Sequence, residues 1–341
     1  MAETRVLLTG ASGFIAKHIA FALLGGGYLV RGTVRSRDKG EALRRSLASA
    51  GADVARLEIA VADLLCDDGW DAAAEGCGLV CHAASPLPLR QPREKFALTP
   101  AAKGGALRVV AAAARAGATR LVLTSSVAAM SYGHGRARGD APFGEDDWSD
   151  VTSKSISPYA VSKTEAEAAA RDAASKAGLD MVAINPAVVL GPLLDDEFGA
   201  SMRLVRMMMR GKMPAVPDVR FGVVDVRDVA AAHVGALTAE GAAGRRFALS
   251  AGSLSLMEMG QAIAAAVPEC RGKVPRLRLP DLVVRLAALV VPDLRAVVGE
   301  LGRGKGFDTD PARRILGFAP AEAARAVEAA AVSLMQRGLA G

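Results

Sequence analysis

Hydrophobic positions in the first half of the chain follow two alternating patterns. Short apolar runs predict buried strands, and longer segments with apolar residues three and four positions apart predict helices. The expected strands are Arg5–Thr9, Tyr28–Val34, Ala55–Ala60, Gly78–His82, Arg120–Ser125 and Met181–Asn185. The expected helices are Phe14–Leu24, Lys39–Ala50, Lys103–Ala116 and Tyr159–Lys176. Strands separated by helices predict an α/β fold with a doubly wound, Rossmann-type parallel sheet covered on both faces.

The pattern changes after Asn185-Pro186. Residues 191–217 mix prolines with a Met-rich helix, and the last third of the chain is mainly helical. Phe221–Val224 and Arg246–Ser250 are predicted strands that return to the sheet. We therefore expect a Rossmann domain at residues 1–190 with returning segments at about 219–250, and a smaller, mainly helical substrate lobe at 191–218 and 251–341.

Composition limits the class of protein. The chain has 341 residues, of which 51% are hydrophobic and 23% are charged, as in a globular protein with a large core. No apolar stretch approaches the roughly 20 residues that cross a membrane. The first residues run directly into a predicted strand and leave no room for a signal peptide. We expect a cytoplasmic protein without a membrane partner.

Charge and cysteine content exclude two further classes. The net charge is +6, but the basic residues are scattered and aromatic residues make up only 4%, so we expect no nucleic-acid partner. The four cysteines form no Cys-x-x-Cys motif. Without such a motif or a nearby pair of histidines, the sequence predicts reduced thiols and no metal site.

Residues 9–16, between the first strand and the first helix, read Thr-Gly-Ala-Ser-Gly-Phe-Ile-Ala. Gly10 permits a tight turn, and Gly13 lets the backbone approach a pyrophosphate at the helix N-terminus. An ordinary tight turn also contains glycines, but this one opens a predicted βαβ unit. The loop therefore predicts a dinucleotide site. Its expected contacts are Gly10, Ser12, Gly13, Phe14 and Ile15.

The end of the second strand indicates which dinucleotide binds. An NAD site usually has Asp or Glu there, to bind the ribose 2′-hydroxyl. Here residues 31–37 contain no carboxylate. Arg35 is suited to bidentate contact with a 2′-phosphate, and Lys39 adds a second positive charge. A solvated basic loop is the alternative. We expect NADP(H).

Other residues follow predicted strands at the carboxyl edge of the sheet, where ligands bind in this fold. Asp63-Leu64 follow the third strand, where the carboxylate can meet an adenine amino group, although this feature taken alone favours an ordinary exposed loop aspartate. The remaining expected cofactor contacts at strand ends are Ala83, Ala84, Ser85, Thr124 and Ser125. The small side chains of Ala83 and Ala84 leave their backbone open to a ligand.

Tyr159 and Lys163 start a predicted helix and lie four residues apart, so both side chains share one face. A phenol with a pKa of about 10 is a poor base at neutral pH, and a nearby cation favours its ionised form. In carbonyl reduction Tyr159 would donate a proton to the oxygen, and Lys163 would hold the cofactor ribose. Ser126, at a strand end, is placed to hydrogen-bond the same oxygen. A surface helix with an aromatic residue and a lysine is the alternative.

Together these residues resemble the extended short-chain dehydrogenase/reductase family. Within it the chain is similar to the branch of dihydroflavonol reductases, cinnamoyl-CoA reductases and methylglyoxal (aldehyde) reductases. The matching segments are Thr9–Ala16, Val34–Arg35, Asp63-Leu64, His82–Pro86, Leu123–Val127, Tyr159–Lys163, Asn185–Pro192 and Val224–His233. The resemblance implies a catalytic triad of Ser126, Tyr159 and Lys163. It also implies cofactor contacts at Pro186, Val188 and Val189 beside the nicotinamide, and at Ser201.

One departure from the family pattern concerns proton transfer. Many extended members have an Asn on the helix after the fourth strand that helps a proton relay. The corresponding segment, residues 99–104, reads Thr-Pro-Ala-Ala-Lys-Gly. The Asn is missing, so a water or a backbone group has to substitute for it.

The sequence thus predicts an NADPH-dependent reductase of aldehydes or ketones. A sugar-nucleotide epimerase or dehydratase with tightly bound NAD is one alternative, and Arg35 argues against it. A 3β-hydroxysteroid dehydrogenase-like enzyme and a non-catalytic NADP-binding redox sensor are the others. The expected partner is a small carbonyl or alcohol substrate, and the protein is expected to be a monomer or a homodimer.

Overall fold

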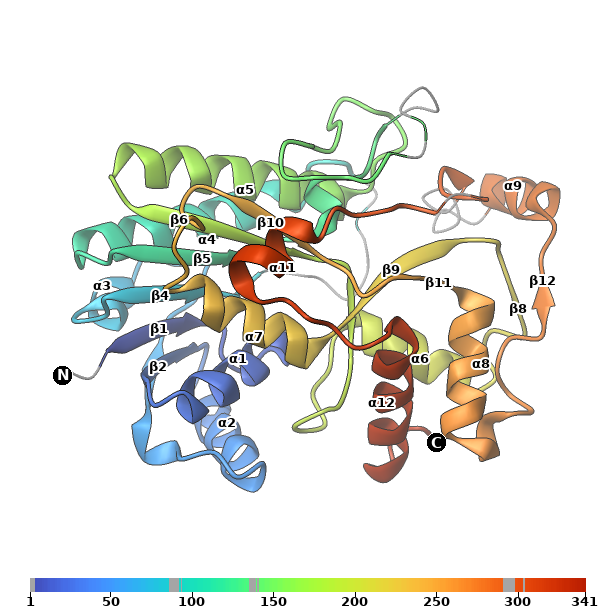
Figure 1. Ribbon diagram of the computed structural model, residues 1–341, viewed down its shortest axis with the longest axis horizontal. Coiled ribbons are helices and arrows are strands. Elements are labelled where there is room, and N and C mark those ends of the chain that lie inside the picture. The colour runs from blue at the N-terminus through green and yellow to red at the C-terminus, as the bar shows by residue number, and fades with distance from the viewer. Residues whose placement is uncertain are drawn as a thin grey trace.

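The computed structural model describes residues 4–85, 92, 94–134, 139, 141–290, 298–302 and 304–341. Its main sheet has seven strands in the order β10-β6-β5-β4-β1-β2-β3, and every pairing is parallel (Figure 1). The strands are β1 (Arg5–Thr9), β2 (Leu29–Val34), β3 (Leu57–Val61), β4 (Leu79–His82), β5 (Arg120–Thr124), β6 (Asp180–Pro186) and β10 (Arg246–Leu249). The predicted doubly wound α/β fold is confirmed.

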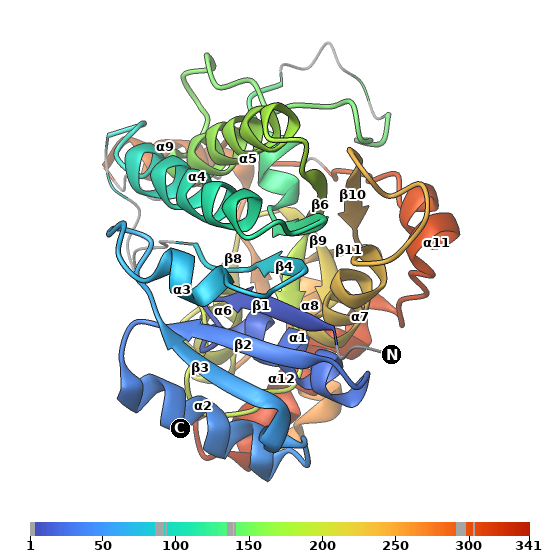
Figure 2. The same ribbon diagram turned by 90° about the vertical axis from the view of Figure 1, so that its left-hand side faces the viewer.

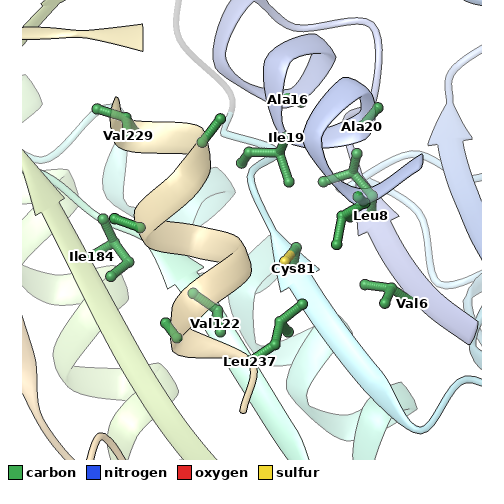
Figure 3. Packing of buried hydrophobic residues seen from close by; sticks show 14 of the residues in the cluster. Val6, Leu8, Ala16, Ile19, Ala20, Cys81, Val122, Ile184, Val229 and Leu237 are labelled. Carbon is green, nitrogen blue, oxygen red and sulfur yellow. The ribbon is translucent and has the colours of Figure 1, made fainter. Parts of the chain in front are cut away.

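Helices cover both faces of this sheet (Figure 2). On one face lie α1 (Phe14–Gly25), α2 (Arg37–Ser49), α7 (Val226–Ala236) and α11 (Asp310–Leu316). On the other lie α3 (Trp70–Ala74), α4 (Thr99–Arg115) and α5 (Pro158–Lys176). Alternate strand positions divide between the two layers, because successive side chains point to opposite faces. In β1, Val6 and Leu8 pack toward α1 and α7, as Figure 3 shows, whereas Leu7 packs toward α3 and α4.

A second hydrophobic core lies beyond the carboxyl edge of the sheet. It packs α6 (Ala200–Met209), α8 (Leu256–Ala266) and α12 (Ala323–Gln336) against a three-stranded sheet of β7 (Val188–Leu190), β9 (Arg220–Asp225) and β11 (Ser253–Ser255). Further elements are β8 (Ala215–Val216), β12 (Leu277–Arg278), α9 (Asp281–Val290) and the 3₁₀ turns Val54–Arg56, Val127–Ala129 and Pro268–Cys270. In the described part of the chain, no helix is long and apolar enough to cross a membrane.

The two strands that were predicted to return to the main sheet belong to different sheets. Arg246–Leu249 pairs with β6 and extends the main sheet, as predicted. The prediction that Phe221–Val224 returns to the main sheet is wrong, because this strand pairs with β7 and β11 in the separate sheet. Its apolar pattern predicted a strand, but the choice of partner depends on β7, which forms after the chain leaves the main sheet at Pro186. The division into a domain and a lobe at the stated boundaries stays a prediction.

Candidate active site

The glycine loop lies directly against the end of β4. Gly10 has a φ of +63°, and a Cβ at this position would lie 2.8 Å from the Cα of Ala84. Any other residue would therefore collide with the backbone and adopt a strained conformation. The Gly10 amide donates to Thr33 Oγ1 at 3.1 Å, which ties the loop to β2 as well. The first turn thus depends on glycine, as the sequence predicts.

The N-terminus of α1 lies open beside this loop. Gly13 is the N-cap residue and provides no side-chain hydrogen bond to the first turn. Backbone amides at such an end point outward with a partial positive charge, which suits a phosphate group. Thr9 links the loop to β4 and the residues after it, because its Oγ1 lies 2.7 Å from His82 Nδ1 and accepts a hydrogen bond from the Ala84 amide at 3.1 Å.

The predicted catalytic residues lie together at the carboxyl edge of the main sheet. Helix α5 begins at Pro158, and Ser157 caps it by accepting the Ala160 amide at 3.2 Å. Tyr159 in its first turn is hydrogen-bonded through its side chain to Ser126, which follows β5. One turn on, Lys163 Nζ donates to the backbone oxygen of Thr124 at 3.3 Å. The structure brings the three predicted residues to one place.

Burial changes the ionisation of both helix residues. It raises the pKa of Tyr159, and the hydrogen bond between Tyr159 and Ser126 opposes this shift. Lys163 was expected to favour the phenolate, but the largest effect on the pKa of Tyr159 is burial, which favours the protonated phenol. Burial also lowers the pKa of Lys163 to about 8, with the Glu167 carboxylate opposing it. The site therefore holds a protonated phenol beside a lysine that titrates slightly above neutral pH.

A buried ion pair lies behind these residues. Glu167 and Arg246 are 1% and 3% exposed, and Arg246 Nε donates to Glu167 Oε1 at 2.5 Å. The other carboxylate oxygen accepts Ser125 Oγ at 2.5 Å and Asn185 Nδ2 at 2.8 Å. Asn185 Nδ2 also donates to the backbone oxygen of Ser126 at 3.1 Å. Glu167 thus fixes the end of β5, from which Ser126 projects.

No sequence motif indicated a role for Glu167 or Arg246. The guanidinium of Arg246 also donates to the backbone oxygens of Glu145 and Asp147, at 3.0 and 2.5 Å, and lies 3.8 Å from the ring centre of Trp148. The spacing of Glu167, four residues after Lys163, was a usable signal, because it places both on one helix face. The partner of Glu167 is distant in sequence, so no local pattern indicates it.

The cations predicted to bind a 2′-phosphate lie at the other end of the site. Arg35 follows β2 and is exposed. Lys39 lies in the first turn of α2, where Ser36 is the N-cap residue. Its Nζ contacts both carboxylate oxygens of Glu197, at 2.9 and 3.1 Å. Glu197 lies close enough to Arg35 for that charge to help lower the pKa of the carboxyl, after the larger effect of the Lys39 hydrogen bond.

Several predicted contacts have side chains that are engaged elsewhere. Thr124 Oγ1 lies 2.7 Å from His233 Nε2, Asp63 Oδ1 accepts the Leu65 amide at 3.0 Å, and Ser201 Oγ donates to the Val189 oxygen at 2.7 Å. Leu64 is buried in the core beside α4. Any contact of Thr124, Ser125 or Leu64 with a ligand would therefore use the backbone.

The other predicted cofactor residues border the same edge of the sheet. Ser12, Phe14 and Ile15 are half-buried in the glycine loop and the start of α1, and Ala83, Ala84 and Ser85 follow β4. Pro186 ends β6, and Val188 and Val189 begin β7. Pro86, part of one matching segment, lies outside the described residues. The role of all these residues in binding stays a prediction.

The histidines and cysteines add no competing chemistry. Burial, reinforced by the charge of Lys163, lowers the pKa of His82 to about 3, so this imidazole is neutral and accepts or donates hydrogen bonds only. All four cysteines are free thiols, and only Cys66 is exposed. Among the described residues, no group of three or more His, Cys, Asp and Glu side chains is arranged to hold a metal ion.

Comparison with known proteins places this geometry in context. A model of the NAD dependent epimerase/dehydratase family matches residues 6–250. Ketoreductase azaE of Aspergillus niger is 35% identical over 333 residues, which cover 92% of each chain. Cinnamoyl-CoA reductase CAD2 of Medicago truncatula is 35% identical over 282 residues, 81% of this chain and 82% of the relative. The crystal structure of Gre2 from Candida albicans in complex with NADPH is 26% identical and superposes with a TM-score of 0.80, covering 98% of this chain and 99% of that one.

Proposed function

Since the chain belongs to the NAD dependent epimerase/dehydratase family, the extended short-chain dehydrogenases/reductases, and is an oxidoreductase of that family, we propose that it reduces an aldehyde or ketone with NADPH. Two relatives that match most of the chain are named as a ketoreductase and a cinnamoyl-CoA reductase. The Gre2 structure holds NADPH. These names support the reaction class and the cofactor and leave the substrate of this chain open.

The observation that carries the proposal is the hydrogen bond between Tyr159 and Ser126 beside Lys163. A protonated phenol is the form needed to donate a proton to a carbonyl oxygen, and burial of Tyr159 keeps it in that form. Ser126 adds a second donor where negative charge develops. Lys163 is then the cation that stabilises the phenolate left when Tyr159 gives up its proton.

The glycine loop fits a dinucleotide. A tight turn closed against Ala84 and an uncapped α1 N-terminus suit a pyrophosphate, because the backbone approaches closely and its amides are available. We place the ribose 2′-phosphate beside Arg35 and Lys39, which follow β2. The proposed contacts are Gly10, Ser12, Gly13, Phe14, Ile15, Arg35, Lys39, Asp63, Leu64, Ala83, Ala84, Ser85, Thr124, Ser125, Tyr159, Lys163, Pro186, Val188, Val189 and Ser201.

When bound, NADPH supplies a hydride from nicotinamide C4 to the carbonyl carbon. Tyr159 donates its phenolic proton to the carbonyl oxygen, so the substrate gains one hydride and one proton and leaves as an alcohol. Lys163 stabilises the resulting phenolate until a proton returns from solvent. We assign residues 191–218 and 251–341 to the lobe that shapes the substrate site.

The test is consumption of NADPH by the purified protein with a panel of aldehydes and ketones, followed at the absorbance band of reduced nicotinamide. We expect turnover with at least one carbonyl, and a loss of about a hundredfold or more in the Tyr159→Phe variant on that carbonyl. NADPH binding without turnover on any carbonyl would contradict the proposal and favour a redox sensor. NAD that copurifies tightly with the protein would favour the epimerase alternative.

A further inference from the structure

Residues 192–197, which we call the strap, run from the end of β7 to the outer surface of α1 and α2. In Figure 1 this yellow-green segment hangs between α2 and α12. Lys17, which is 2% exposed, forms an ion pair with Asp195, and Ser46 Oγ donates to the Leu194 oxygen at 3.1 Å. On the other side, Arg337 of the C-terminal segment contacts the carboxylate of Asp196 at 3.0 Å.

The last strap residue, Glu197, holds Lys39 with both carboxylate oxygens. The two side chains border a cavity of about 410 Å³ whose lining also includes Ser12 and Asp195. Ser12 belongs to the glycine loop, so the cavity adjoins the proposed dinucleotide site. The carboxylate of Glu197 therefore pairs with Lys39, one of the two cations expected to bind the cofactor 2′-phosphate.

The negative charge of Glu197 is important because it lies near the end of β2. In this fold the adenosine ribose of the cofactor lies at the end of the second strand. A 2′-phosphate there would be attracted by Arg35 and Lys39 and repelled by Glu197. A 2′-hydroxyl carries no charge and would meet no such repulsion.

We propose that Glu197 competes with the 2′-phosphate of NADPH for Lys39 and thereby limits the preference of this protein for NADPH over NADH. The proposal rests on the proposed function, which places NADPH at this site. Binding of NADPH breaks the Lys39–Glu197 ion pair and replaces it with a contact between Lys39 and the phosphate. Binding of NADH leaves the pair intact.

The exchange needs only a side-chain movement. Asp195 and Leu194 hold the strap on α1 and α2 through their own contacts, and neither contact involves Lys39. The side chains of Lys39 and Glu197 are 36% and 65% exposed, so solvent can hydrate the carboxylate once it is displaced. Ion pairs between side chains this exposed contribute little free energy, so the 2′-phosphate can displace Glu197 from Lys39.

The experiment measures dissociation constants of NADPH and NADH, by fluorescence titration, for the wild type, Glu197→Gln and Asp196→Asn. Asp196→Asn is the matched control, because it removes the same charge from the adjacent residue, which pairs with Arg337 instead. We expect Glu197→Gln to tighten NADPH by roughly threefold to tenfold and to leave NADH within about twofold. The control should leave both cofactors within about twofold, and the gain should shrink in high salt.

One further variant tests the competition for Lys39, and the outcomes of the titrations separate this proposal from the proposed function on which it rests. In a Lys39→Met background the gain from Glu197→Gln should fall, because the competition for that lysine is gone. Equal effects of Glu197→Gln and Asp196→Asn on a wild type that prefers NADPH would overturn the role of Glu197 and leave the cofactor assignment standing. A wild type that binds NADPH no better than NADH, and a Glu197→Gln variant that does the same, would overturn both. Circular dichroism of each variant establishes that the fold is retained.

Discussion

The two ends of the proposed cofactor site are built differently. At the catalytic end, the backbone of Ser126 is held by a buried network centred on Glu167 and Arg246, whose side chains are 0% and 2% exposed, and the Glu167 charge acts on Lys163. At the adenosine end, Lys39 and Glu197 meet in an exposed ion pair. A buried charge that loses its partner keeps the full desolvation penalty, whereas an exposed one is hydrated by water. The catalytic end is therefore fixed before a ligand arrives, and the adenosine end can exchange partners.

The largest expected effect is at the catalytic end. Replacing Tyr159 by Phe removes the proton donor while keeping the ring, so kcat should fall by roughly 10²–10⁴-fold. NADPH affinity should stay within a few-fold, because the phosphate contacts lie elsewhere. Steady-state kinetics and a fluorescence titration measure the two quantities. A variant that keeps more than a tenth of the wild-type kcat would remove Tyr159 from the mechanism.

The contrast between buried and exposed pairs has a direct test in stability. Glu167→Ala leaves Arg246 charged and buried, which should lower the free energy of unfolding by about 3–5 kcal/mol. Glu145→Ala is the control, because its partner Arg245 and Glu145 itself are about one-third exposed. That change should cost about 1 kcal/mol or less. Urea denaturation measures both, and equal losses would contradict the distinction between the two kinds of pair.

The pH profile reports on the same buried end. Lys163 carries its charge below its pKa of about 8, and the raised pKa of Tyr159 keeps the phenol protonated in this range. We expect kcat/KM for reduction to be level below pH 8 and to fall above it, by roughly tenfold per pH unit. Glu167→Gln should move the fall to lower pH, since the carboxylate opposes the effect of burial. A profile unchanged in that variant would exclude an influence of Glu167 on Lys163.

The smallest expected effect in this series is at the exposed end. Arg35→Ala should weaken NADPH binding by about tenfold, because it removes a charge-assisted contact with the 2′-phosphate. NADH, which lacks that phosphate, should bind within about twofold of the wild type. Arg37→Ala serves as the control, since it removes an exposed cation two residues away. An equal loss of both cofactors would contradict the assignment of Arg35.

Local sequence patterns predicted the main sheet well, because each strand and helix satisfies its own periodicity. Predicted ends differ from observed ends by at most four residues, as at α2, which begins at Arg37 rather than Lys39 because Ser36 caps it. The glycine loop and the Tyr159–Lys163 pair were also predictable, since each lies within one turn or one helix face. Within one turn or one helix face, residues that are close in the sequence are also close in space.

Tertiary structure decided everything that joins distant segments. The Glu167–Arg246 pair spans 79 positions and the Lys39–Glu197 pair spans 158. The partner of β9 likewise depended on the position of β7, which lies outside the main sheet. The sequence around a carboxylate does not indicate which cation will pair with it, or whether the pair will be buried or exposed to water. Burial and distance set the strength of each charge pair, and packing fixes both only after the chain has folded.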